Sequence, residues 1–261
     1  MQRFTIVAKK NEKSLSTKKI IKKQLESHNM IYDEVSPELI ISVGGDGTLL
    51  YAVHKYIDQL DSAKFLAIHT GTLGFFTDYT EDEIDQCIKD ILKGEIYEIF
   101  ESHLLEVKIN GNKHETLYAL NEIRIENVLT TQTLDIYIDS EFFERVRGNG
   151  MCLSTQAGST AYNRALSGAV VDSGLSVMQL CEIAGIHDSK HGSLRVPYIM
   201  KKDRKVTFTC DMFKNAYLCY DHLNQKIGTD VKTITCQICD KRVKFARFKK
   251  YSYLERLRNL Y

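Results

Sequence analysis

The first hundred residues alternate between short apolar runs and stretches in which apolar residues recur at helical spacing. Residues 4–8, 39–43 and 65–69 are nearly continuous apolar runs. Runs of this kind fit strands that are covered on both faces, as in a parallel sheet. Because each run is followed by a stretch of helical spacing, the pattern predicts an α/β N-terminal domain over residues 1–100.

Three helices are predicted in this region. The first begins at a cap on Ser14 or Ser16 and ends near Ser27. Its expected inward-facing residues are Ile20, Ile21 and Leu25. The second covers residues 49–57, and the third ends at Gly94, a residue suited to a left-handed C-cap. The apolar positions of the third are Ile84, Ile88, Ile91 and Leu92.

The pattern changes near Phe100 to short alternating segments that are typical of strands. Residues 104–109 alternate, and Asn110-Gly111 is a strong hairpin signal. Further strands are expected at 117–126, 134–138 and 142–147, and in alternating segments between 206 and 248. Helical turns are expected at 160–166 and 177–184. Residues 101–248 therefore predict a β-rich, antiparallel C-terminal domain.

Composition and charge narrow the class of protein. The 261 residues are 43% hydrophobic and carry a formal net charge of +1, so no global field favours nucleic acid or a membrane surface. No apolar run approaches the roughly 20 residues that span a bilayer, and the N-terminus is too short in apolar residues for a signal peptide. Seven cysteines, an odd number, indicate thiols of a cytoplasmic protein rather than a disulfide framework.

Two local clusters are candidates for binding sites. Cys236 and Cys239 have the spacing of half a zinc site, but no second pair exists and the segment reads as a strand. No metal ligand is therefore assigned to the protein. Basic residues crowd the C-terminal end: Lys241, Arg242, Lys244, Arg247, Lys249 and Lys250. A solvated strand face and tail is favoured there over a phosphate-binding patch.

The run Gly-Gly-Asp-Gly-Thr, residues 44–48, carries the clearest chemistry. Paired glycines after a buried strand let the backbone turn sharply, and free amides before a helix form an anion site. Within this turn Asp46 could hold Mg²⁺, accept the proton of an attacking hydroxyl, or only cap the helix. The five residues together at a strand-to-helix junction favour a phosphate-handling loop, and an exposed Asp46 is expected to be ionised at pH 7.

Two further segments lie in the second half of the chain. Asn121-Glu122 offers an amide and a carboxylate that could bind ribose hydroxyls and an amino group. Residues 154–163, Ser-Thr-Gln-Ala-Gly-Ser-Thr-Ala-Tyr-Asn, combine small hydroxyl residues, a glycine and an aromatic ring at a helix start. Such a string could read a purine edge and pack on a base, whereas a capped helix start explains its residues only one at a time.

The chain resembles the NAD kinase family in these segments. The Gly-Gly-Asp-Gly-Thr loop also occurs in phosphofructokinases and in diacylglycerol and sphingosine kinases. The Asn121-Glu122 pair and the string at 154–163 are not expected together in those groups. The similar segments, in order, are 44–48, 70–75, 119–122, 147–150, 154–163 and 221–222. The resemblance implies an α/β N-terminal domain with a Rossmann-like parallel sheet, a β-rich C-terminal domain, and a tail over 249–261 that returns to the first.

The resemblance also implies a reaction and a set of roles. The family transfers a phosphoryl group from ATP or another donor such as polyphosphate, with Mg²⁺ or another divalent cation, to the 2′-hydroxyl of the adenosine ribose of NAD. Asp46 would be the proton acceptor, with Gly45 and Gly47 near the phosphates. Asn121 and Glu122 would bind ribose and adenine. Further nucleotide-binding positions implied are Phe75, Arg147, Asn149, Thr160, Ala161, Tyr162, Asn163, Ala165, Ala184 and Asp221. Some would come from a partner subunit, because family members are usually homodimers or homotetramers.

The chain departs from the family at several positions. Asn149 stands where an aspartate is usual. The change could weaken NAD binding by on the order of 1 kcal/mol, or it could leave the affinity intact, since Asn still accepts hydrogen bonds. Gln156 and Ala157 replace a common proline and hydroxyl residue, and His222 replaces a common glycine. Two other functions stay open at this stage: a lipid kinase of the diacylglycerol kinase type, and a non-catalytic protein that binds NAD or NADP.

Overall fold

The computed structural model describes residues 1–71, 74–111, 114–187 and 192–258. The chain divides into two compact units. The first unit contains Met1–Ser102 and Lys241–Tyr261, and the second contains His103–Asp240. Of the expected returning tail, residues 259–261 lie outside the described residues.

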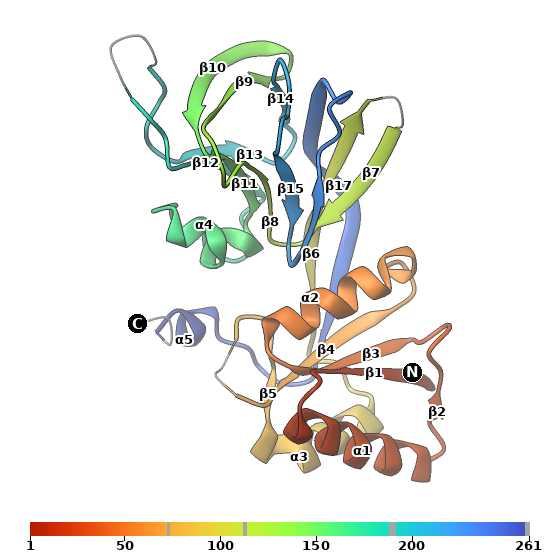
Figure 1. The fold of residues 1–261 in the computed structure, drawn as a ribbon. Coiled ribbons are helices and arrows are strands. Elements are labelled where there is room, and N and C mark those ends of the chain that lie inside the picture. Colours follow the sequence, from red (N-terminus) through yellow and green to blue (C-terminus); the bar gives the residue numbers. More distant parts are fainter. Residues whose placement is uncertain (72–73, 112–113, 188–191, 259–261) are drawn as a thin grey trace. The chain divides into compact units, whose positions relative to one another are not determined.

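The first unit is built on a sheet of parallel strands in the order β2-β1-β3-β4, with the end of β17 and the short β5 on β4 (Figure 1). The strands are β1 (Arg3–Ala8), β2 (Ile31–Tyr32), β3 (Leu39–Gly44), β4 (Lys64–His69), β5 (Tyr79–Thr80) and β17 (Thr233–Arg247). Ile6 lies beside Ile41, and Ile41 beside Leu66. Every residue of β3 is buried, which explains its nearly continuous apolar run.

Helices cover both faces of this sheet. α1 (Glu12–Ser27) and α3 (Ile84–Lys93) lie on one face, and α2 (Asp46–Lys55) lies on the other (Figure 1). Short 3-10 turns occur at Ile57–Gln59 and Glu81–Glu83, and α5 (Tyr253–Arg258) follows β17. Because alternate residues of a strand face opposite ways, Ile6 and Ile41 pack with Ile21 and Leu25 of α1. Gly94 ends α3 with φ 72°, as expected of a left-handed C-cap.

Three details of the first unit differ from expectation. The N-cap of α1 is Asn11, whose side chain accepts the Ser14 amide at 2.8 Å, so neither Ser14 nor Ser16 is the cap. Ile20 is 44% exposed rather than inward. Arg247 is not part of a solvated basic face, since it is 2% exposed and paired with the buried Asp78.

The second unit contains two antiparallel layers. One layer has the order β10-β9-β14-β17, with the β6–β7 hairpin beside β17. The other has the order β13-β12-β11-β8-β15-β16. The strands are β6 (Glu98–Asn110), β7 (His114–Ala119), β8 (Glu122–Glu126), β9 (Gln132–Ile138), β10 (Glu141–Gly148), β11 (Gly150–Thr155), β12 (Val177–Ile183), β13 (Tyr198–Lys201), β14 (Lys205–Thr209), β15 (Tyr217–Tyr220) and β16 (Leu223–Lys226). Two short helical segments, Ala157–Thr160 and α4 (Tyr162–Ala165), follow β11.

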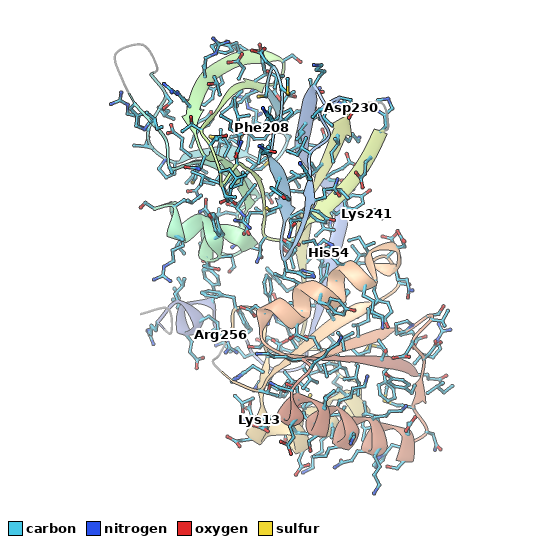
Figure 2. All side chains as sticks on the ribbon, viewed as in Figure 1. Lys13, His54, Phe208, Asp230, Lys241 and Arg256 are labelled. Carbon is cyan, nitrogen blue, oxygen red and sulfur yellow. The ribbon has the colours of Figure 1, made fainter. Side chains whose placement is uncertain are left out.

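One apolar core joins these layers. Phe208 of β14 and Ile136 of β9 pack in the same cluster as Leu153 of β11 and Leu218 of β15. Figure 2 places Phe208 inside this unit, among side chains from its strands. The expected α/β unit followed by an antiparallel β-rich unit is therefore confirmed.

Two predicted elements of the second unit were wrong. Residues 177–184 were expected to form helical turns but are mostly β12, because pairing with β11 overrides the spacing of apolar residues. The single strand expected over 117–126 is interrupted at Leu120 and Asn121, between β7 and β8. In the β6–β7 turn, Asn110 and Gly111 are described but residues 112–113 lie outside the described residues. Cys236 and Cys239 lie three apart on β17, so their side chains face opposite sides of the strand.

Candidate functional site

In the first unit, the end of the Gly-Gly-Asp-Gly-Thr run is helical, whereas a loop was expected. β3 ends at Gly44, Gly45 is the N-cap of α2, and Asp46 is already the first residue of that helix. The expected helix start at residue 49 is therefore wrong by three residues. A side chain at Gly44 would place a Cβ 2.2 Å from the Thr48 hydroxyl oxygen, so the turn requires glycine there. The tight junction places Asp46 at the carboxyl edge of the parallel strands.

Asp46 is held by two consecutive backbone amides. The Phe75 amide donates to Oδ2 at 2.9 Å, and the Phe76 amide donates to Oδ1 at 3.1 Å. The side chain is half-buried rather than exposed as expected. Burial raises the pKa of Asp46 above its ordinary value, although the two amides, Arg256 and His69 favour the charged form.

Gly74 is the residue that lets the carboxylate come so close to this segment. A Cβ at Gly74 would lie 2.2 Å from Asp46 Oδ1, well inside van der Waals contact. This role for Gly74 was missed from the sequence, where it was only one letter of the 70–75 loop. Thr72 and Leu73 of that loop lie outside the described residues. Thr70 bonds through its hydroxyl to Ser14 at 2.7 Å.

A cavity of about 400 Å³ opens beside the start of α2. Its lining residues are Ala8, Lys9, Lys10, Gly45, Gly47, Thr48 and Tyr51. Two lysines that follow β1 thus share a hollow with the N-terminal turn of a helix, where amides and the helix dipole favour anions. Sequence reasoning passed over Lys9 and Lys10, although their place directly after a buried strand was a usable signal.

In the second unit, the chain between β7 and β8 is fixed by hydrogen bonds to Asp221. Its carboxylate accepts the amides of Leu120 at 2.8 Å and Asn121 at 2.7 Å, while its own amide donates to the Glu122 carbonyl. Thr155 reinforces the break, since its hydroxyl donates to the Leu120 carbonyl at 2.6 Å and accepts the Gly158 amide at 3.1 Å. These bonds fix the backbone at Asn121 and Glu122.

Several polar atoms around this break are buried without a hydrogen-bond partner. They are Asn121 Oδ1, Glu122 Oε2, Ser154 Oγ and Asn163 Nδ2. Buried polar groups are nearly always paired, so a group of unpaired ones marks this break as a candidate ligand site. Burial, and then the neighbouring Asp221 charge, raise the pKa of Glu122 to about 7, against the opposing effects of Arg124 and the Tyr162 amide.

The string at 154–163 is folded against this break. Gly158 lies so close to Asn121 that a Cβ would be 2.0 Å from its carbonyl oxygen. The guanidinium of Arg124 lies 4.0 Å from the centre of the Tyr162 ring. Gln156, one of the departures, donates to the Val171 carbonyl at 3.1 Å. Thr160 ends the 3-10 turn, and Ala161 links it to α4, which carries Asn163 on its buried side and an exposed Ala165.

The structure does not bring all predicted residues of this unit together. Ser154 of β11 pairs with Glu122, whereas Gly150, four residues away, pairs with Glu126 and Ile183. Four residues of strand span about 13 Å. The other predicted residues, Arg147, Asn149 and Ala184, lie at this second end of β11. Asn149 is engaged there, since its side chain donates to the Asn127 carbonyl at 2.7 Å.

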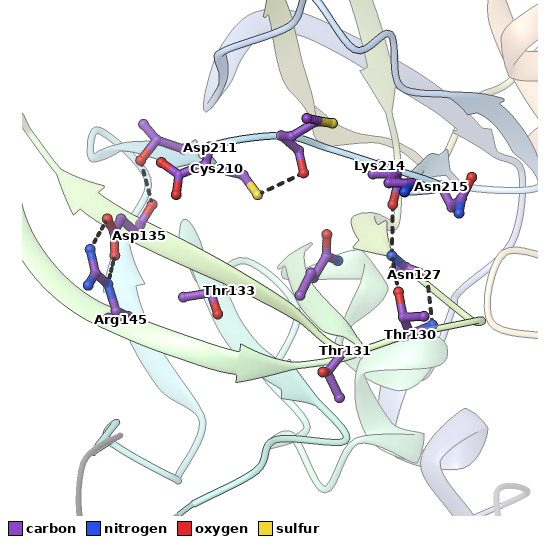
Figure 3. Close-up of a pocket in the computed structure, with 13 residues that line it drawn as sticks. Asn127, Thr130, Thr131, Thr133, Asp135, Arg145, Cys210, Asp211, Lys214 and Asn215 are labelled. Atoms are coloured by element: carbon purple, nitrogen blue, oxygen red, sulfur yellow. Dashed lines mark hydrogen bonds and ion pairs between the residues drawn. The ribbon is translucent and has the colours of Figure 1, made fainter.

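A further cavity of the second unit lies away from these motifs. It measures about 780 Å³ and is lined by polar residues from β9, β10 and the segment after β14 (Figure 3). Asp135 and Arg145 neutralise each other in its wall, with 2.5 and 2.7 Å contacts. None of the residues predicted to bind nucleotide lines it. Its connection to them is indirect, through Gln132, which donates to the Asn149 carbonyl at 2.9 Å.

Family comparisons cover both units. A model of the ATP-NAD kinase N-terminal domain matches residues 4–96, and a model of the ATP-NAD kinase C-terminal domain matches residues 120–248. NAD kinase 1 of Bacillus cereus is 35% identical over 260 residues, covering 98% of this chain and 97% of its own length. The NAD kinase of Geobacillus stearothermophilus is 37% identical over 259 residues, covering 98% and 95%.

Solved structures show the same fold. Yeast NADH kinase complexed with NADH superposes with a TM-score of 0.85 at 19% identity, covering 100% of this chain and 86% of that one. An NAD kinase from Archaeoglobus fulgidus in complex with ATP gives 0.80 at 21% identity, covering 99% and 98%. None of these relatives is a lipid kinase. Across the described ranges, no helix is both long and apolar enough to cross a membrane.

Proposed function

Because the chain belongs to the NAD kinase family and is an NAD kinase, which phosphorylates the 2′-hydroxyl of the adenosine ribose of NAD to give NADP, we propose that Asp46 is the base for that hydroxyl. The observation that carries the proposal is the pair of hydrogen bonds that two backbone amides donate to the two carboxylate oxygens of Asp46. A carboxylate has about four acceptor positions, so two remain for the substrate proton. The raised pKa brings Asp46 closer to neutral pH, where a base works best.

The step is a single in-line transfer. Asp46 takes the proton as the 2′-oxygen forms a bond to the γ-phosphorus of ATP, and the bond from that phosphorus to the bridging oxygen breaks to release ADP. Transfer of this kind depends mainly on positioning and on neutralising phosphate charge. In the described part of the chain no group of three or more metal-ligating side chains exists. Mg²⁺ bound to ATP would neutralise charge on the phosphates during the transfer.

We assign the donor phosphates to the cavity beside α2. Gly45 and Gly47 contribute backbone, Thr48 a hydroxyl, and Lys9 and Lys10 positive charge. Lysine suits this task because its ammonium neutralises phosphate as a compact charge. Phe75 is assigned to the same unit, where its amide holds Asp46.

We assign the adenosine end of NAD to the break between β7 and β8. Asn121, Glu122 and Asn163 supply the unpaired polar atoms, and Thr160 to Tyr162 supply backbone and an aromatic ring. Asp221 acts by holding the Leu120 and Asn121 amides. Arg147, Asn149 and Ala184 are assigned to the opposite end of the dinucleotide, in the same or a partner subunit of a homodimer or homotetramer. Ala165, exposed on α4, is assigned to that partner's contact.

The remaining assignments concern domains and location. Residues 1–100, with the tail 249–261, are assigned to phosphoryl transfer, and residues 101–248 to NAD binding. We assign the protein to the cytoplasm because its seven cysteines, an odd number, suit reduced thiols rather than a disulfide framework.

Replacing Asp46 with Asn tests the base directly. The variant should lose about 10²–10⁴-fold in kcat, because a general base typically contributes that much. NADP formation from Mg·ATP and NAD is measured, with NAD binding followed by calorimetry and folding by circular dichroism. Near-normal turnover in a folded variant would refute the role. Loss of turnover with NAD affinity retained supports it.

A further inference from the structure

The grip on Asp46 depends on one particular peptide group. The carbonyl of Phe75 and the amide of Phe76 are the two ends of a single peptide unit, which is planar and trans, so they point in opposite directions. The amide end donates to Asp46 Oδ1 at 3.1 Å. The carbonyl end accepts a hydrogen bond from the Tyr251 hydroxyl at 2.6 Å. Tyr251 and Asp46 therefore hold opposite ends of the same rigid unit.

Other contacts fix the flanks of this peptide but not its rotation. The Phe76 ring is 7% exposed and stacks on Phe245 at 5.5 Å, with an angle of 13° between the rings. Thr77 bonds back to Gly74 at 3.3 Å. These contacts hold the side chain on one side and the turn on the other. The peptide between Phe75 and Phe76 could still rotate about its flanking bonds unless its carbonyl were held.

Tyr251 is itself held by buried charge. The Arg247 guanidinium lies 3.6 Å from the centre of the Tyr251 ring, and Arg247 is paired with Asp78 in the interior of the first unit. Burial raises the pKa of Tyr251 to about 12, so its hydroxyl stays protonated and remains a donor at physiological pH. Arg256, labelled in Figure 2 on α5, lies 5.4 Å from the same ring.

We propose that Tyr251 is a positioning residue for the phosphoryl transfer, holding the Phe75 carbonyl so that the Phe76 amide keeps the Asp46 carboxylate oriented toward the substrate hydroxyl. The inference rests on the proposed role of Asp46 as base. A hydrogen bond to the carbonyl of an amide also strengthens the bond that its N–H donates. The C-terminal segment thus contributes to catalysis without touching substrate.

Tyr251→Phe tests the proposal, because it removes one hydroxyl and leaves the ring on Arg247. We expect kcat to fall about 10-fold, since small misplacements of a reacting group are costly, while KM for NAD and for ATP changes less than about 2-fold. Tyr97→Phe is the matched control: Tyr97 belongs to the same unit and its side chain is 64% exposed. It should keep the parent kcat.

The pH profile of kcat separates positioning from mere stability. The amides favour ionised Asp46, so loosening them raises its pKa and moves the acidic limb of the profile to higher pH. The charges that face Asp46, Arg256 of α5 and His69 of β4, are the same in Tyr251→Phe and in the parent. Both variants are also melted, and each should stay folded at the assay temperature.

The outcomes are distinct. A parent-like kcat and acidic limb in folded Tyr251→Phe overturns the positioning role, and so does a lower kcat with an unmoved limb. Asp46→Asn is measured in the same series. If that variant turns over normally, the base role fails and this inference falls with it. If it is inactive while Tyr251→Phe is unaffected, only the positioning role fails.

Discussion

At the scale of single residues, the ionised carboxylate of the buried Glu122 lowers the stability of the fold at the proposed NAD site. It is 5% exposed, one of its oxygens is unpaired, and its pKa is raised to about 7. An acid whose pKa is raised by folding binds its proton more tightly in the folded state. The ionised form therefore destabilises the fold above about pH 7, and this cost fades as pH falls toward 4.5. A ligand that donates hydrogen bonds to the carboxylate would relieve it.

Glu122→Gln should therefore stabilise the protein while weakening NAD binding. At pH 8 the gain in unfolding free energy is expected to reach up to about 3 kcal/mol, and at pH 5 it should be much smaller. Denaturant unfolding at the two pH values measures it. In the parent, the Kd for NAD should rise as pH falls from 8 to 6, and in Glu122→Gln it should be flat. A parent-like pH dependence in the variant would contradict the assignment.

Sequence reasoning at this scale found the chemical groups but not their surroundings. Asp46, Asn121 and Glu122 were identified from residue type and spacing. The half-burial of Asp46 was missed, because it comes from residues 74–76, nearly thirty positions away. Gly74 and Tyr251 were missed for the same reason: their roles are contacts with residues distant in sequence. Whether the predicted nucleotide-binding residues bind NAD stays a prediction.

At the scale of elements, the interruption between β7 and β8 is the feature that places the buried Asn121 and Glu122 at the proposed NAD site. No glycine or proline interrupts residues 117–126, so the sequence predicts one strand. The break exists because Asp221 and Thr155, both distant in sequence, take the backbone groups that a continuous ladder would use. Likewise, β12 reads as helical until its pairing with β11 is known. Long-range pairing decided both elements.

Thr155→Val should loosen this break without changing its shape. The hydroxyl that is lost bonds to the Leu120 carbonyl and the Gly158 amide, both inside the fold. We expect a loss of about 1–3 kcal/mol in unfolding free energy and a higher Kd for NAD. Thr116→Val, at an exposed position of β7, is the control and should change neither. Equal stability of the two variants would show that the hydroxyl does not hold the break.

At the scale of the whole molecule, the two units are connected unequally. The second unit is one continuous stretch, His103–Asp240, while the first is assembled from both ends of the chain. The contribution of the C-terminal residues to the first unit was hard to predict from the sequence, because the single strand β17 continues from one unit into the other. The expected return of the tail came from the family resemblance alone. The two classes of sheet, in contrast, were predicted directly from the apolar patterns. Parallel strands are usually buried on both faces and read as continuous apolar runs, whereas antiparallel strands are commonly buried on one face and alternate.

A fragment of residues 103–240 should fold alone into its two-layered β structure. It keeps the whole cluster around Phe208 and Leu153, and its strands pair among themselves. A fragment of residues 1–102 should not, because it lacks Phe245 and the Arg247 that pairs with buried Asp78, and an unpaired buried charge costs roughly 3–5 kcal/mol. Circular dichroism and thermal melting of both fragments check this. A cooperative melt of 1–102 would contradict it.

The order of synthesis gives the Tyr251 contact a further meaning. Asp46 leaves the ribosome early, but the hydroxyl that holds the far side of its peptide support is made about two hundred residues later. At a usual rate of roughly 5–20 residues per second, the nascent chain spends at least ten seconds or so with its base unsupported. Catalytic competence is thus acquired among the final steps of translation. A chain that stops short of residue 251 would carry the whole Gly-Gly-Asp-Gly-Thr signature yet lack the contact that orients the Asp46 carboxylate.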